Sequence, residues 1–180
     1  MRIICIAVVL ILSLECFAKE WAVLIRGNER PTYVRGQNGS LLKQQVKNVQ
    51  SGAIIRSDDN GTYVITAYHI FRGSNIEFQV GVPGHGWFYA DYIGGDRDAD
   101  LAVFKLKTAK KFESVELAEQ TPRSGTFTIY GYPGGRNIPL LRRGVFVPKN
   151  WVKQHVSFSF KAYQGDSGSG ILDSRGRLVA

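Results

Sequence analysis

Short apolar or alternating segments recur about every ten residues from Trp21 onward, and turn-forming residues separate them. The segments are rich in Val, Ile, Phe, Tyr and Thr, which favour strands, and Gly, Asn, Asp and Pro bound them. Alternation with a period of two indicates strands with one buried face. The predicted strands are Trp21–Ile25, Gly52–Arg56, Thr62–Ala67, Ile76–Val82, Trp87–Ile93, Leu101–Leu106, Phe127–Gly131, Gly144–Pro148, His155–Ala162, and Gly170–Asp173 with Arg177–Ala180.

Turn-forming residues and one charged stretch divide this strand pattern into parts. The Asn60-Gly61 pair predicts a hairpin, because these residues tolerate the positive φ angles of tight turns. A second turn is predicted over Asp173–Gly176. The polar residues of Leu41–Gln50 fit either a twisted strand or a short helix, and the charged stretch Lys107–Ser124 is typical of a linker. The pattern indicates an all-β protein with two groups of strands, built as a sandwich or as barrels.

The first residues follow a different pattern, that of a targeting segment. Arg2 precedes an apolar run over Ile3–Leu14, and small residues stand at Cys16 and Ala18. These features predict a secretory signal peptide over residues 1–18, and hence a secreted or periplasmic protein. A membrane anchor is the alternative, but spanning a bilayer takes about 20 apolar residues and Glu15 ends this run. No later segment is apolar for long enough to span a membrane.

The distribution of cysteine and histidine excludes several kinds of site. Cys5 and Cys16 both lie in the predicted signal, so the remaining chain has no cysteine for a disulfide, a thiolate ligand or a nucleophile. His69, His85 and His155 stand far apart and lack the paired spacing of metal ligands. We therefore expect neither a metal site nor a cofactor.

Composition and charge narrow the function classes further. Hydrophobic residues make up 44% of the 180, which excludes a disordered or low-complexity chain. Lys and Arg number 23 against 15 Asp and Glu, and the net charge of +8 leaves contact with acidic surfaces open. A nucleic-acid partner is not expected, because no interleaved Arg and aromatic motif is present and secretion argues against it.

The segment Gly165–Gly170 holds a serine between glycines, with the sequence Gly-Asp-Ser-Gly-Ser-Gly. Glycines on both sides allow a tight turn, leave the Ser167 hydroxyl uncovered and direct amide N–H groups toward one spot. A nucleophile with an oxyanion hole needs this arrangement. By itself, such a segment is more often a plain turn, because a serine nucleophile also requires a base.

Two further segments offer that base and a carboxylate to orient it. His69 follows the apolar strand predicted over Thr62–Ala67, where a neutral imidazole can accept a proton. Without a partner it would be a half-buried histidine at a strand end. Asp98 and Asp100 precede the apolar strand Leu101–Leu106, where a half-buried acid needs a partner. Either acid also fits a plain turn in this acidic loop.

Taken in chain order, these motifs resemble those of the trypsin/chymotrypsin-like serine peptidases. The sequence carries Thr66-Ala67-Tyr68-His69, then Asp100-Leu101-Ala102-Val103, then Gly165-Asp166-Ser167-Gly168-Ser169. A fourth match, Tyr130-Gly131-Tyr132-Pro133-Gly134-Gly135, is similar to the opening of the second barrel in bacterial members. The chain most resembles the bacterial glutamyl-endopeptidase and HtrA-type branch, over Ser51–Ala180.

This resemblance implies two six-stranded antiparallel β-barrels with the active site in the cleft between them. We expect a peptidase domain over residues 19–180, with the first barrel at about 40–106, a linker at 107–125 and the second barrel at 126–180. In the family, a further strand follows the one that begins at Arg177. The sequence ends at Ala180, so we expect the chain to be truncated after the nucleophile hairpin and the second barrel to be incomplete.

The resemblance also assigns roles to residues of this chain. Ser167 would attack the scissile carbonyl, His69 would relay the proton and Asp100 would hold the imidazole. The backbone N–H groups of Gly165 and Ser167 would stabilise the oxyanion. Asp98 is the alternative to Asp100, since residues two apart point to the same side of an extended chain.

The surroundings of the serine add two expectations. In members activated by cleavage, the acid before the nucleophile pairs with a newly cut aliphatic amino terminus, which Lys19-Glu20-Trp21 does not match. We therefore expect Asp166 to have a local partner. Lys161 stands where the family has the floor of its specificity pocket; facing inward, it would favour acidic substrate side chains. We expect it to face outward as a solvated residue, because an unpartnered buried lysine is costly.

The sequence thus predicts a secreted serine endopeptidase that hydrolyses polypeptide substrates through a Ser-His-Asp triad and an acyl-enzyme intermediate. The alternative is a catalytically inactive, truncated relative that binds peptides or an acidic surface. All three triad residues are present, and a non-catalytic relative has no chemical need for them. We therefore favour the enzyme.

Overall fold

The computed structural model describes residues 19–28, 32–35, 38, 40–44, 47–71, 77–120, 122–147 and 157–180. The signal peptide predicted over residues 1–18 lies outside the described residues. The described part consists of strands and two short 3₁₀ helices, η1 (Tyr68–Phe71) and η2 (Pro133–Gly135). Neither helix in that part has the length and apolar character needed to cross a bilayer.

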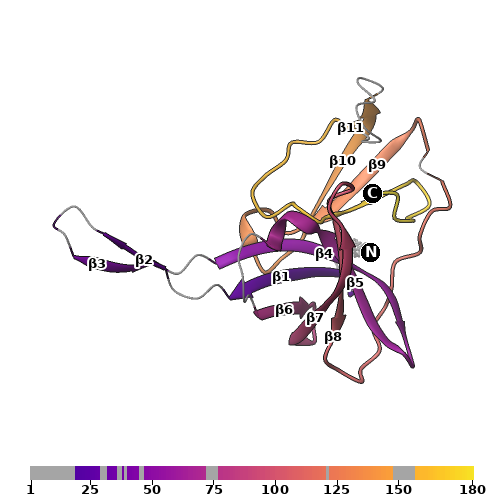
Figure 1. Cartoon of the computed structure of the whole chain (residues 1–180). Coiled ribbons are helices and arrows are strands. Elements are labelled where there is room, and N and C mark those ends of the chain that lie inside the picture. Colours follow the sequence, from indigo (N-terminus) through magenta and orange to yellow (C-terminus); the bar gives the residue numbers. More distant parts are fainter. Residues whose placement is uncertain are drawn as a thin grey trace, which may run out of the picture.

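Six strands of the first half close into an antiparallel barrel, in the order β1-β4-β5-β8-β7-β6 (Figure 1). Its strands are β1 (Ala22–Asn28), β4 (Lys47–Asp58), β5 (Gly61–Ala67), β6 (Glu77–Val82), β7 (Gly86–Asp96) and β8 (Leu101–Leu106). The barrel start predicted at about residue 40 is wrong, because β1 pairs with both β4 and β6 and closes the barrel. These pairings join segments far apart in the sequence, which a local hydrophobic pattern does not reveal.

The described residues of the ambiguous segment Leu41–Gln50 form strands rather than a helix. Leu41–Gln44 is β3, which pairs with β2 (Thr32–Arg35) in a separate two-stranded sheet. Lys47–Gln50 is the start of β4, and Gln45 and Val46 lie outside the described residues. The predicted hairpin at Asn60-Gly61 is confirmed, because β4 and β5 pair directly across it and Gly61 has a φ of +128°.

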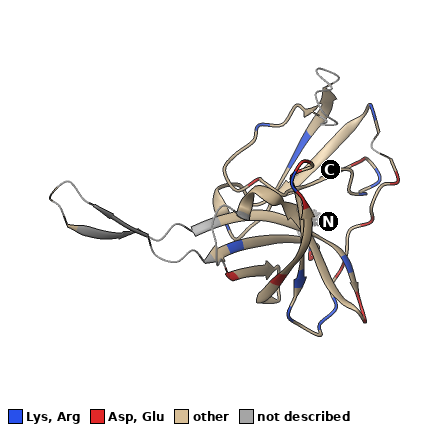
Figure 2. Cartoon of the chain, viewed as in Figure 1, with Lys and Arg blue, Asp and Glu red and all other residues tan. Residues whose placement is uncertain are grey.

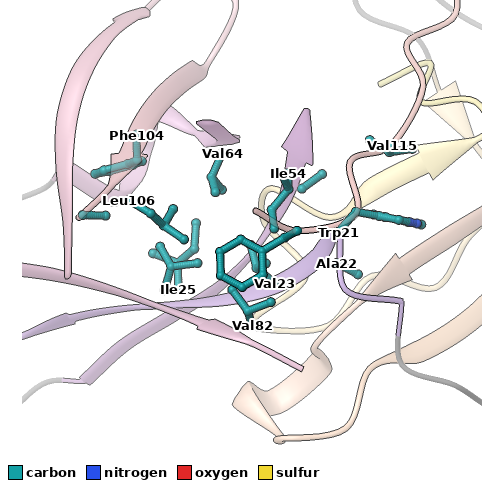
Figure 3. Close-up of a cluster of buried hydrophobic side chains, with 14 of the residues drawn as sticks. Trp21, Ala22, Val23, Ile25, Ile54, Val64, Val82, Phe104, Leu106 and Val115 are labelled. Atoms are coloured by element: carbon teal, nitrogen blue, oxygen red, sulfur yellow. The ribbon is translucent and has the colours of Figure 1, made fainter. Parts of the chain in front are cut away.

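The inward-facing side chains of the barrel form one apolar core (Figure 3). Along β5 the residues alternate, so that Thr62, Val64 and Thr66 are buried. Val64 packs with other fully buried side chains of this core, namely Val23, Ile25, Ile54, Val80 and Phe104. Burying one such large side chain stabilises a fold by about 1.5–3 kcal/mol. The barrel is therefore a rigid base for the loops at its rim.

The second half forms an open four-stranded antiparallel sheet, ordered β11-β10-β9-β12. Its strands are β9 (Thr126–Gly131), β10 (Leu140–Val147), β11 (Ser157–Phe158) and β12 (Gly170–Leu172). The described part is thus nearly all-β, with a closed six-stranded barrel and a half-barrel. This architecture confirms the predicted fold class, with a second barrel that is incomplete.

The strand predicted over His155–Ala162 is shorter in the structure. Residues 148–156 lie outside the described part, and the described strand covers only Ser157–Phe158. At Ser159 the side-chain hydroxyl accepts the N–H of Val145 at 2.9 Å, while the Ser159 N–H donates to the Val145 carbonyl at 3.0 Å. The regular ladder ends here because a side chain replaces the backbone carbonyl as the acceptor.

Direct contacts join the barrel to the second sheet. The hydroxyl of Tyr132, just after β9, donates to the Ala22 carbonyl of β1 at 2.7 Å. The rings of Trp21 and Tyr130 lie 5.4 Å apart, and both are buried. Burial raises the pKa of Tyr132, and the neighbouring Tyr130 adds to the rise, so the phenol keeps its proton and remains a donor. The segment after β9 is thereby fixed against the barrel.

Candidate active site

His69 lies in η1, immediately after β5. The N–H of Tyr68 donates to the carbonyl of Asp100 at 2.9 Å, and the N–H of His69 donates to the Asp100 carboxylate at 2.8 Å. In the antiparallel pairing of β5 with β8, Ala67 lies opposite Leu101. Tyr68, which follows β5, therefore lies next to Asp100, which precedes β8. The position of the histidine thus follows from the register of the barrel.

Asp100 also meets the ring of His69. Its Oδ2 lies 2.8 Å from Nδ1 of the imidazole. The φ of Asp100 is +55°, in the left-handed region, which aspartate tolerates better than most residues. The alternative acid, Asp98, is exposed, and its backbone N–H donates to the Asp96 carboxylate. Of the two candidates, the structure therefore brings Asp100 to the imidazole.

Ser167 extends this hydrogen-bonded chain from the barrel to the second sheet. Its Oγ lies 3.0 Å from Nε2 of His69. An ionised carboxylate only accepts, so Asp100 holds the imidazole proton on Nδ1 and leaves Nε2 to accept from the serine hydroxyl. The side chains of His69 and Asp100 are 38% and 46% exposed, so the site is open to solvent. The arrangement can pass a proton from the serine to the histidine.

The peptide before Gly165 is fixed by a contact with η2. The carbonyl of Gln164 accepts the N–H of Gly134 at 2.5 Å. Across a trans peptide the carbonyl and the following N–H point in opposite directions, so the N–H of Gly165 points away from η2. Gly165 has a φ of +91°, and a Cβ there would lie 2.6 Å from the carbonyl oxygen of Tyr132. This position therefore requires glycine.

The peptide before Ser167 is fixed in the same way. The carbonyl of Asp166 accepts the N–H of Ser169 at 2.8 Å, which turns the N–H of Ser167 in the opposite direction. Within the described part of the chain, the N–H groups of Gly165 and Ser167 have no protein acceptor. Free donors on the serine itself and two residues before it suit a developing oxyanion. These two groups form the candidate oxyanion hole.

A buried ion pair holds the residue that precedes the serine. Arg142, on β10, donates to both carboxylate oxygens of Asp166, at 2.7 and 2.5 Å. The two side chains are only 14% and 7% exposed. The carboxylate also accepts the N–H of Tyr163 at 2.7 Å, and Arg142 donates to the Lys161 carbonyl at 2.7 Å. This forked, charge-assisted arrangement fixes the backbone leading to Ser167.

Sequence reasoning predicted a local partner for Asp166 but did not identify Arg142. The two residues are 24 positions apart, Arg142 on β10 and Asp166 in the loop before β12, so no spacing rule connects them. The hint in the sequence is the charged pair Arg142-Arg143 inside the otherwise apolar strand Leu140–Val147. A charge in such a strand needs a partner when it is buried, and Asp166 was the acid that lacked one.

Lys161, which stands where the family has the floor of its specificity pocket and was expected to face outward, is exposed. Its ammonium group lies 5.3 Å from the centroid of the Tyr163 ring. An ammonium over an aromatic face at an exposed site is a weak surface interaction. Lys161 thus lies at the surface.

The space beside the site is apolar and open. A cavity of about 510 Å³ adjoins Asp100 where the two sheets meet, and its walls include Ile65, Leu101, Leu117 and Leu178. In the described residues, no cluster of three or more His, Cys, Asp or Glu side chains has the arrangement of a metal site.

The chain is similar to bacterial serine endoproteases. A probable periplasmic serine endoprotease, DegP-like, from Buchnera aphidicola subsp. Schizaphis graminum is 25% identical over 154 residues, covering 79% of this chain and 31% of the relative. The crystal structure of a serine endoprotease from Yersinia pestis matches with a TM-score of 0.66 and 21% identity, covering 89% of this chain and 52% of that chain. The HtrA-type protease AlgW, solved with a tripeptide, matches with a TM-score of 0.67 and 18% identity, covering 89% and 50%.

These matches differ in what they establish. The chain spans about a third of the length of the curated relative and about half of each solved chain. At such low identity the two solved structures show a shared fold. Residues 50–180, which include His69, Asp100 and Ser167, match the family model described as a trypsin-like peptidase domain. The chain therefore belongs to the trypsin-like peptidase family.

Proposed function

We propose that this protein is a serine endopeptidase of the HtrA type, in which Ser167, His69 and Asp100 form the catalytic triad. The observation that carries the proposal is the continuous chain of their side chains, with contacts of 2.8 Å between Asp100 and His69 and 3.0 Å between His69 and Ser167. Each contact has the length and the atom types that general-base activation of a serine requires.

The first half of the reaction acylates the serine. Ser167 Oγ attacks the scissile carbonyl carbon while His69 Nε2 takes its proton, and Asp100 stabilises the imidazolium that forms. The carbonyl oxygen becomes an oxyanion, which accepts hydrogen bonds from the N–H groups of Gly165 and Ser167. When the tetrahedral intermediate collapses, the C–N bond breaks and His69 donates its proton to the leaving amine. An ester between Ser167 and the substrate remains.

The second half of the reaction hydrolyses that ester. His69 Nε2 takes a proton from a water molecule, whose oxygen attacks the acyl carbonyl carbon. The same two N–H groups stabilise the second oxyanion. His69 then returns the proton to Ser167 Oγ as the ester bond breaks, and the carboxylic acid product leaves. The serine hydroxyl is restored for another turnover.

The proposed location of the protein is the periplasm or the cell exterior, and its proposed substrate is a polypeptide. Support comes from the signal-like segment over residues 1–18 and from the periplasmic description of the DegP-like relative. Binding to an acidic surface has weaker support. Figure 2 shows basic and acidic residues interspersed over the described ribbon, with no single basic face in that view.

Digestion of an unstructured protein tests this function. We expect purified protein to cut β-casein into fragments with new amino termini, and the Ser167→Ala variant, with the same circular dichroism spectrum, to leave casein intact. The fragments are separated by electrophoresis and identified by mass spectrometry. Intact casein after incubation with folded wild-type protein, or equal cleavage by the Ser167→Ala variant, would reject the proposal.

A change at Lys161 should leave substrate preference unaltered. Because this side chain is exposed and lies over Tyr163, we expect Lys161→Ala to leave the ratio of cleavage after Glu to cleavage after Leu as in the wild type. Competing peptide substrates that differ only at that residue measure the ratio. A selective loss of cleavage after Glu would show instead that Lys161 reaches the substrate.

A further inference from the structure

Ser51 is a fully buried polar residue of β4 whose hydrogen-bonding groups all have partners. Its hydroxyl donates to the carbonyl of Gly165 at 2.7 Å and accepts the N–H of Tyr132 at 2.8 Å. Its backbone N–H donates to the carbonyl of Ser167 at 2.9 Å. Its carbonyl accepts the hydroxyl of Thr66 at 2.7 Å. One residue of the barrel thus contacts the nucleophile loop at two places.

The contact with the Gly165 carbonyl falls on the peptide plane that joins the two planes carrying the candidate oxyanion donors. The plane between Gly165 and Asp166 lies between the two planes whose N–H groups are free. Its carbonyl is held by the Ser51 hydroxyl, and its N–H donates to the Tyr163 carbonyl at 3.1 Å. Rotation of this middle plane would change the angle and the separation of the flanking N–H groups of Gly165 and Ser167. The hydroxyl of Ser51 therefore acts on both donors through one contact.

We propose that Ser51 is a positioning residue. Its hydroxyl holds the Gly165 carbonyl and so fixes the oxyanion hole to the barrel. The proposal rests on the proposed peptidase function. Ser51 lies outside the triad, and its role would be to keep the N–H groups of Gly165 and Ser167 directed at one point. Through its contact with Tyr132, the same hydroxyl links that alignment to the docking of the second sheet on the barrel.

The local chemistry explains why this contact matters. Gly165 has no side chain to restrict its backbone, and its φ of +91° belongs to a region that glycine leaves and enters readily. Without the Ser51 hydroxyl, the Gly165 carbonyl and the Tyr132 N–H would lose a shared partner in a buried place. A buried carbonyl or N–H without a hydrogen-bond partner costs free energy. Rotation of the Gly165–Asp166 peptide would let the Gly165 carbonyl reach another donor.

The test compares acylation by wild-type protein and by Ser51→Ala. The variant keeps the backbone contact with Ser167 and removes only the hydroxyl. The burst of p-nitrophenol from p-nitrophenyl acetate, followed by stopped flow over a range of ester concentrations, gives the acylation rate constant and the ester dissociation constant separately. We expect the rate constant to fall by about 10- to 100-fold, less than the 10²–10³-fold loss that follows outright removal of an oxyanion donor. The dissociation constant should stay the same.

The matched control is Thr62→Val, which removes another buried hydroxyl from the adjacent strand β5. Thr62 is 1% exposed and bonds with Ser57 and the Lys110 carbonyl, with no contact to the nucleophile loop. We expect this variant to lose stability but to acylate at the wild-type rate. A merely structural role for Ser51 would make the two variants behave alike.

The outcomes separate this inference from the proposed function. A wild-type protein that shows no burst would overturn both. A wild-type burst, with folded Ser51→Ala acylating at the same rate or changed only in ester affinity, would overturn the role of Ser51 alone. If Ser51→Ala does not fold, Ser51→Cys, which keeps the volume and a weak donor, takes its place. It should show a smaller fall in rate, and a wild-type rate would contradict the proposal.

Discussion

Replacing His69 by alanine is expected to lower kcat for peptide hydrolysis by about 10⁴- to 10⁶-fold, and replacing Ser167 by alanine should do the same. The reason is that Ser167 is a weak nucleophile unless His69, 3.0 Å away, removes its proton in the transition state. Because the two act as one unit, the double variant should be no slower than either single variant. Initial rates on a fluorogenic peptide, measured with all three proteins, check this expectation.

The matched control for this experiment is His85→Ala. His85 also lies against a carboxylate, with its Nε2 2.7 Å from Oε1 of Glu20, and its ring packs against Phe112 rather than near Ser167. Its loss should leave kcat at the wild-type level. A double variant slower than both single variants by the product of their effects would show that His69 and Ser167 act independently, against the proposed mechanism.

Breaking the Arg142–Asp166 pair should cost about 3–5 kcal/mol of folding free energy, because Arg142→Met leaves the buried Asp166 carboxylate without its cationic partner. Activity should fall further than the folded fraction does, since the pair holds the backbone on the amino-terminal side of Ser167. The double variant Arg142→Met with Asp166→Asn should recover much of the stability, because no unpaired charge is then buried. Urea unfolding of the three variants gives the free energies.

An exposed ion pair provides the comparison for this prediction. Arg56 and Asp58 form a 2.5 Å contact, but their side chains are 56% and 38% exposed. Solvent screens such a pair, so Arg56→Met should have little effect on unfolding. Equal losses of stability in Arg56→Met and Arg142→Met would mean that burial does not set the value of the Arg142–Asp166 pair. A stable but inactive Arg142→Met variant would assign the pair to positioning of the loop alone.

The parts of the site that the sequence predicted are those with local signatures. His69 follows the apolar strand predicted over Thr62–Ala67, and Ser167 lies in a segment whose glycines indicate a tight turn. The sequence alone does not separate Asp100 from Asp98, because acids two residues apart point to the same side of an extended chain. The structure brings Asp100 to His69 because Asp100 sits at a positive φ next to the first residue of β8.

The parts that sequence reasoning missed depend on contacts between distant segments. β1 closes the barrel by pairing with β4 and β6, which no local period could indicate. Arg142 reaches from β10 to Asp166 in the loop before β12, and Ser51 reaches Gly165 from the barrel, 114 positions away. In the sequence, Ser51 is only a small polar residue before a predicted apolar strand, and Arg142 is only a charge in an otherwise apolar segment; both are weak signals. Their meaning becomes clear only when the fold shows which buried group each one satisfies.

The most direct test of the central claim, that Ser167 is an activated nucleophile, is covalent labelling with a fluorophosphonate probe. The hydroxyl attacks the phosphorus, fluoride leaves and the serine becomes phosphonylated, which mass spectrometry of the digested protein can locate. We expect the wild-type protein to carry one label, on Ser167, and folded Ser167→Ala and His69→Ala variants to carry none. Folded wild-type protein that remains unlabelled, or a label on another residue that persists in Ser167→Ala, would contradict the claim.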